Sequence, residues 1–209
     1  MGATFGTEFD APALKQPGPE PGFSLMDPAA PLILTLQFDE RSFAFFDAQR
    51  RRYFPPERNF IPAHLTLFHA LPGEHLASIE RDIEAHASRR HPFGLDVTGL
   101  QPLGRGVAYA LASTELAQLR RDLALHWNDW LKPQDRQNHQ PHVTVQNKVH
   151  PSAARALLEE LSDGFRPFHA EAIGLELWWY RGGPWERVRA FAFDMRGQES
   201  LSRAGEGQG

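Results

Sequence analysis

Residues 62–68 are PAHLTLF and residues 140–146 are QPHVTVQ, and both contain histidine, an apolar residue, threonine and a second apolar residue in that order. The polar members of the two motifs are His64, Thr66, His142 and Thr144. Side chains alternate between the two faces of a β-strand, so each histidine shares a face with its own threonine. The apolar residues between them need helices to pack against, which predicts that both His-Thr pairs line a cleft on the other side of the sheet.

A single motif of this kind has a simpler explanation. The chain has ten histidines, so one His-x-Thr pattern can arise by chance, and a lone histidine in a strand is usually a hydrogen-bonded core residue. This sequence has two copies of the motif, and each follows a proline by one or two residues. Both copies also lie at equivalent points of a repeated order of elements, so coincidence is the weaker hypothesis.

Two imidazoles and two hydroxyls in one cleft suit phosphoryl chemistry. The ordinary pKa of histidine lies near 6.5, so one imidazole can serve as a base while its partner serves as an acid. Threonine hydroxyls can donate hydrogen bonds to phosphate oxygens. The motifs therefore predict a metal-independent phosphoesterase with no cofactor. Which of His64 and His142 is the acid stays open, because the choice depends on how the substrate is oriented.

Strand and helix patterns alternate around the motifs and predict an α/β fold. The predicted strands are 32–38, 64–68, 93–97, 107–111, 142–145, 173–179 and 188–193. The predicted helices are a short one around residues 43–48, one opened by Gly73, one capped by Ser113 that ends near Pro133, and one beginning at Pro151. The order of strand, helix, His-x-Thr strand and helix occurs twice, which indicates an internally duplicated protein of two lobes.

Composition limits the function classes. The 209 residues carry a formal net charge of −4, which argues against a protein that binds long duplex DNA by neutralising phosphates, although a short or single-ended nucleic acid remains compatible. Without cysteine there is no thiolate nucleophile or thiolate metal site. The longest apolar stretch, around 31–38, is far too short to span a bilayer, and no signal-peptide pattern is present. We expect a cytoplasmic protein with no membrane partner.

The ends of the chain differ from its middle. Residues 1–30 are rich in proline and glycine without an apolar period, which predicts a loose arm, and 197–209 predict a flexible tail. Residues 31–196 are expected to form a single domain of two lobes. We expect a monomer, because the amphipathic helices leave no spare apolar face.

The two motifs resemble those of the two-histidine (2H) phosphoesterase superfamily, especially its 2',5' RNA ligase or RNA 2',3'-cyclic phosphodiesterase branch. The resemblance covers approximately 32–196. It implies a bilobal fold in which two antiparallel or mixed sheets face a central groove, with helices outside. It also implies that His64 and His142 are the acid-base pair and that Thr66 and Thr144 bind phosphate. The implied reaction uses water to open a 2',3'-cyclic phosphate, on an RNA end or a nucleotide, to a 2'-phosphate. Run in reverse with an RNA hydroxyl as one partner, the implied chemistry gives a 2',5' linkage.

Further substrate contacts are expected among residues near the motifs. Lys148 lies at even spacing from His142, Arg58 precedes the first motif, and Arg105 lies in a hairpin turn, so each is a candidate phosphate ligand. Phe68, at even spacing from His64, and Tyr109 are candidates to stack on a base. Solvated surface or core packing is the alternative for all five. His69 falls on the face opposite His64, and we expect it to be a surface or structural residue.

Two other function classes remain. A non-catalytic module that binds nucleotides or RNA ends on the same scaffold is the nearer alternative, although a pure binder would more naturally use arginine. A metal hydrolase has little support, because the sequence has no His-Glu-x-x-His or His-x-His-x-Asp pattern.

Overall fold

The computed structural model describes residues 30–195, which contain seven strands, five α-helices and two short 3-10 helices. The strands are β1 (Leu32–Phe38), β2 (Leu65–Leu71), β3 (Phe93–Pro102), β4 (Val107–Ala112), β5 (His142–Gln146), β6 (Phe168–Trp179) and β7 (Glu186–Ala192). The helices are α1 (Glu40–Tyr53), α2 (Leu76–Ala87), α3 (Thr114–His126), α4 (Pro133–Arg136) and α5 (Pro151–Asp163), with η1 at Pro56–Arg58 and η2 at Gly73–His75. The predicted N-terminal arm, apart from residue 30, and the predicted tail lie outside the described residues.

The strands form one sheet in the order β2-β1-β6-β3-β4-β5, with β7 also paired to β6. All neighbouring strands are antiparallel. We expected two sheets, and the structure joins them because β6 is 12 residues long. Its first part, up to Ala172, pairs with β3, and the part from Ala172 onward pairs with β1. One strand therefore belongs to both halves of the molecule.

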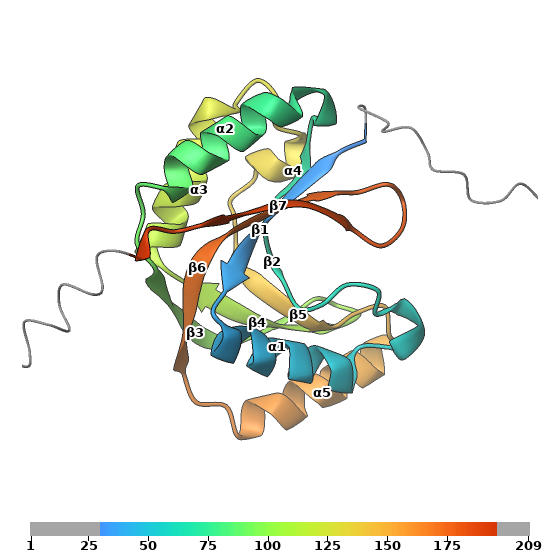
Figure 1. Cartoon of the computed structure of the whole chain (residues 1–209). Helices are drawn as coiled ribbons and strands as arrows, with labels where there is room; N and C mark the ends of the chain where they lie inside the picture. The colour runs from blue at the N-terminus through green and yellow to red at the C-terminus, as the bar shows by residue number, and fades with distance from the viewer. Residues whose placement is uncertain (1–29, 196–209) are drawn as a thin grey trace, which may run out of the picture.

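The helices lie in two groups, one over each half of the sheet (Figure 1). Helices α1 and α5 pack on the half that contains β3, β4 and β5, whereas α2, α3 and α4 lie over the other half. The edge strands β2 and β5, which end the strand order at opposite sides, contact each other. The two His-x-Thr segments are thereby brought together from positions far apart in the chain.

The helices begin and end largely where local signals predict. Ser113 caps α3, its hydroxyl accepting a hydrogen bond from the Leu116 amide, and Gly164 follows α5. Helix α3 ends at His126, earlier than expected, and Pro133 instead begins α4. Helix α1 has 14 residues and is longer than expected. The polar residues Asp47 and Arg50 occupy part of its buried face, so the apolar period alone predicts a shorter helix. No helix within residues 30–195 is long and apolar enough to cross a membrane.

Strand β2 contains an irregularity that redirects its side chains. Thr35 of β1 pairs with Thr66, but the preceding residue, Leu34, pairs with Phe68, so Leu67 is an extra residue. Such a β-bulge reverses the alternation of faces beyond it. Phe68 is consequently fully buried, with its ring 5.2 Å from that of Trp127. Phe68 belongs to the core, contrary to the prediction that it shares the face of His64.

Candidate active site

His64 and His142 have the same local geometry. His64 directly precedes β2, and His142 is the first residue of β5. Nδ1 of His64 lies 2.8 Å from the carbonyl oxygen of Pro62, and Nδ1 of His142 lies 2.9 Å from that of Gln140. A carbonyl oxygen only accepts hydrogen bonds, so Nδ1 carries the proton in each ring. Nε2 is therefore the nitrogen left for chemistry in both.

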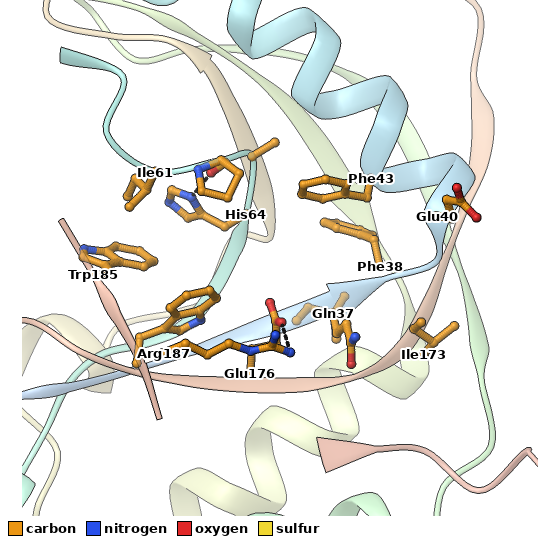
Figure 2. A pocket seen from close by; sticks show the side chains of 14 residues that line it. Gln37, Phe38, Glu40, Phe43, Ile61, His64, Ile173, Glu176, Trp185 and Arg187 are labelled. Carbon is orange, nitrogen blue, oxygen red and sulfur yellow. Dashed lines mark hydrogen bonds and ion pairs between the residues drawn. The ribbon is translucent and has the colours of Figure 1, made fainter. Parts of the chain in front are cut away.

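His64 opens onto a cavity of about 410 Å³, which we call the Trp cavity. Trp185 flanks the imidazole at 4.6 Å between ring centroids, and Trp178 lies next to Trp185. Figure 2 shows His64 and Trp185 on one side of this cavity, with Phe38 and Phe43 beyond it. Its charged members are Glu40 and an ion pair between Arg187 and Glu176, 2.8 Å apart. The Trp cavity is a mainly apolar recess beside one histidine, and four of its lining side chains are aromatic.

The pKa of His64 is lowered to about 4, chiefly by burial and also by the positive charges of Arg50, His142 and His69, against the opposing effect of the Pro62 carbonyl. His64 is consequently neutral at pH 7, with a lone pair on Nε2. The charged forms of His142 and His69 both lower the pKa of His64, so protonation of one imidazole disfavours protonation of His64.

His142 lines a second cavity of about 350 Å³, the histidine cavity, together with His69, His139 and Arg120. The pKa of His139 is lowered to about 4, chiefly by burial and also by nearby positive charges such as Arg120, against the opposing effect of the Thr66 carbonyl. Nε2 of His139 lies 2.9 Å from the carbonyl oxygen of Thr66. His139 therefore ties the segment before β5 to the first motif.

The threonines occupy equivalent positions in the two strands. Both are half-buried, and neither hydroxyl makes a hydrogen bond to another residue in the range 30–195. Their carbonyls are held by basic side chains, that of Thr66 by His139 and that of Thr144 by Nη1 of Arg50 at 2.9 Å. Arg50 is 4% exposed, and burial lowers its pKa to about 10. The backbone of each motif is fixed while its hydroxyl remains available to a ligand.

His69 is a site residue that the sequence did not reveal. The bulge turns it out of the core, so that its half-exposed ring lines the histidine cavity. Its Nδ1 lies 3.0 Å from Oδ1 of Asp135, which is 1% exposed and also accepts the amide hydrogens of His69 and Ala70. Burial raises the pKa of Asp135, but these hydrogen bonds outweigh it and leave the pKa below its ordinary value. A buried carboxylate thus orients a third imidazole of the groove. No sequence signal marks the bulge.

Arg58 and Lys148 line a third cavity of about 700 Å³ together with His69, and we call it the cationic cavity. Lys148 lies beyond the end of β5 and has φ 61°, so the even spacing from His142 does not explain its position. The structure nevertheless brings both cations next to the histidine cavity, with which the cationic cavity shares His69.

The other two candidates lie elsewhere. Nε of Arg105 donates to the carbonyl of Val149 at 3.1 Å, so this side chain holds the loop after β5. Tyr109 pairs with Val143, which places it on the face that packs against helices, opposite to His142. It is 5% exposed, and its ring contacts Phe46. Core packing, the alternative explanation for Tyr109, describes its position.

Metal ligands are not grouped in the part of the chain that the structure describes. Within it, no three histidine, aspartate or glutamate side chains are arranged to hold a metal ion. The two motifs and the histidine cavity offer imidazoles, the threonine hydroxyls and the guanidinium of Arg120 as donors, a set that suits an anion.

The sequence and the fold are both similar to those of known proteins. The sequence profile of the 2'-5' RNA ligase superfamily matches residues 38–184. Similar solved structures include TT0787 of Thermus thermophilus, with a TM-score of 0.57 at 15% identity over 79% of this chain and 98% of that chain. E. coli LigT in its apo form has a TM-score of 0.52 at 20% identity, over 79% and 98% of the two chains. Its complex with NADP+ has a TM-score of 0.51 at 19% identity, over 78% and 98%. No curated protein matches the sequence.

Proposed function

The chain belongs to the 2'-5' RNA ligase superfamily, and from that premise we propose that it is a metal-independent phosphodiesterase that opens 2',3'-cyclic phosphates to 2'-phosphates. The observation that carries the proposal is the repeated histidine geometry. In both motifs Nδ1 is bound to the carbonyl two residues earlier, so both imidazoles keep Nε2 for chemistry, and the contact between β2 and β5 brings the two motifs together. A pair of this kind supplies both proton transfers of a phosphodiester cleavage.

The pKa of His64 favours it as the base. Being neutral at pH 7, its Nε2 takes a proton from water as the water oxygen bonds to phosphorus. The bond between phosphorus and the 3' oxygen breaks, and His142 delivers a proton to that oxygen. The 2' ester remains, so the product is a 2'-phosphate. The same step with an RNA 5'-hydroxyl in place of water as the nucleophile forms a 2',5' linkage.

The hydroxyls of Thr66 and Thr144 stabilise the charge that develops on the non-bridging phosphate oxygens. Both are free of hydrogen bonds to other described residues, and their strands are held by His139 and Arg50. Donors that are fixed before the reaction cost little reorganisation in the transition state. This is the role we propose for the two threonines.

The Trp cavity suits the nucleoside that carries the cyclic phosphate. Its indole rings offer stacking surfaces beside His64, and base stacking tolerates any base. One of the similar structures is LigT complexed with NADP+, and we extend a nucleotide ligand to this chain on the strength of the shared fold and the aromatic cavity.

The test is hydrolysis of 2',3'-cyclic mononucleotides in excess EDTA. We expect His64→Ala and His142→Ala each to lower kcat by about 10²–10⁴, the usual worth of an acid or base. His169→Ala is the matched control, because that side chain is 84% exposed and pairs with Asp96 on the surface. Phosphorus NMR of the product distinguishes a 2'- from a 3'-phosphate.

Three results would contradict the proposal. Turnover that survives in both histidine variants would remove the acid-base pair, and turnover that EDTA abolishes would point to a metal hydrolase. A wild type that binds cyclic nucleotides without cleaving them would support the binding-module alternative.

A further inference from the structure

The cationic cavity combines positive charge with exposed aromatic rings. Its charged members are Arg50, Arg58 and Lys148, and no aspartate or glutamate lines it. The whole chain has a net charge of −4, so this concentration of positive charge runs against the composition of the protein. Cations without acids favour an anionic ligand.

Two of the three cations are available to a ligand. Arg50 donates to Asn59, to the carbonyl of Ile61 and to that of Thr144, so it is already bound. Arg58 and Lys148 are exposed, and neither side chain has an ion pair or hydrogen bond with another of residues 30–195. Arg58 in η1 and Lys148 after β5 approach the cavity from separate elements.

Two of the rings in this cavity are exposed. Phe60 is 67% exposed and Tyr180 is 43% exposed, and both line the cavity. Large apolar rings at a surface are the usual platform for unpaired bases, on which stacking is worth about 1–3 kcal/mol per base. A ligand with both a phosphate and a planar ring would satisfy the cations and the rings together.

The cationic cavity adjoins both parts of the active site. It shares Ile61 and Trp185 with the Trp cavity, and it shares His69 with the histidine cavity. A ligand in it is therefore contiguous with whatever lies between His64 and His142.

We propose that the cationic cavity binds a second nucleotide, the one preceding the nucleotide that carries the cyclic phosphate, with its phosphate at Arg58 and Lys148 and its base on Phe60 or Tyr180. The physiological substrate is then an RNA end and not a free mononucleotide. This inference rests on the proposed function for its kinetic test, but it concerns residues that take no part in the chemical step.

The experiment compares a dinucleotide ending in a 2',3'-cyclic phosphate with the mononucleoside 2',3'-cyclic phosphate of the same base. We expect kcat/KM to be about tenfold or more higher for the dinucleotide, as one stacked base predicts. The double variant Arg58→Gln/Lys148→Gln brings this ratio close to one, and Phe60→Ala lowers it as well. The preference for the dinucleotide also weakens as the salt concentration rises. The logarithm of the kcat/KM ratio should fall with the logarithm of the salt concentration with a slope of about −0.7, the value for one single-strand phosphate.

The matched control is Arg89→Gln/Arg155→Gln, which removes two exposed arginines, one just after α2 and one in α5, and should keep the ratio of the wild type. Equal kcat/KM for the two substrates overturns the inference, and so does a ratio that the control lowers as much as the cavity variant. If no substrate is cleaved, the proposed function fails by itself. Calorimetry with a dinucleotide 3'-phosphate and a nucleoside 3'-phosphate then decides, since tighter dinucleotide binding that the cavity variant loses supports the second site and equal affinities overturn it.

Discussion

At the scale of single residues, the environment of His64 separates it from an ordinary histidine. Trp185 lies against its ring and Arg50 is nearby, and burial brings its pKa to about 4. A histidine with a lowered pKa loses its function as a base only at a correspondingly low pH.

The first prediction concerns the pH profile of kcat/KM. Protonated His64 cannot accept a proton, so kcat/KM should fall as the pH drops through about 4, about tenfold per pH unit, and not at the ordinary 6.5. Replacing Trp185 with alanine admits water to the ring, which should move this limb upward toward 6.5. The measurement is kcat/KM on a cyclic mononucleotide across the acid range, with circular dichroism at each pH to establish that the protein stays folded. A wild-type limb at 6.5 would contradict the assignment.

Single residues also show where sequence reasoning stops. The two His-x-Thr pairs are visible in the sequence because their spacing has a direct chemical meaning. His69 and Phe68 exchange the faces expected for them, because one extra residue in β2 reverses the alternation. A bulge depends on how β1 and β2 pair, and pairing is not encoded in the local pattern of β2.

At the scale of elements, Gly106 controls how closely β4 approaches the end of β5. A Cβ atom at this position would lie 1.9 Å from the carbonyl oxygen of Gln146 and 2.6 Å from Cα of Asn147. Both are backbone atoms, so no side chain can move aside. The same close approach sets the path of the chain between His142 and Lys148.

The second prediction is that Gly106→Ala destabilises the protein. The inserted methyl must push β4 and β5 apart, and overpacking of this kind typically costs about 1–3 kcal/mol. Urea unfolding measures the loss. Gly99→Ala in β3 is the control, since a Cβ there would meet no atom within 4 Å. Equal stabilities of the two variants would show that the approach of β5 is not tight.

Elements differ in how far the sequence predicts them. The apolar period identifies α2, whose buried residues are Ile79, Ile83 and Ala87, and alternation with a turn identifies the β3–β4 hairpin. These features are local. The apolar pattern predicts a shorter α1 than the structure has, because the inner face of this helix is partly polar. The central place of β6 depends on partners far away in the chain.

At the scale of the whole molecule, β6 makes the two halves interdependent. Each half completes its part of the sheet with a different portion of the same strand. We therefore expect residues 31–196 to unfold as the single domain that the sequence predicts.

The third prediction is one cooperative unfolding transition. Tryptophan fluorescence, which reports on the half that contains β1 and β2 through Trp127, Trp178 and Trp185, should coincide with far-ultraviolet circular dichroism, which reports on both halves, in urea. Leu175→Ala removes a fully buried side chain from β6 and should lower the stability by about 2–5 kcal/mol without splitting the transition. Two separated transitions would show that the halves are independent.

The position of β6 in the chain has a consequence for synthesis. Thr35 of β1 pairs with Glu176 of β6, 141 positions later. During translation, β1 emerges from the ribosome long before its central partner exists, and its apolar sequence LILTLQF resembles segments that aggregate when unpaired. One edge of β1 can pair with β2 soon after it is made, but the other edge stays open until β6 follows. The sheet is therefore completed only after most of residues 30–195 have been synthesised, and until then the nascent chain exposes an apolar strand edge of the kind that chaperones protect.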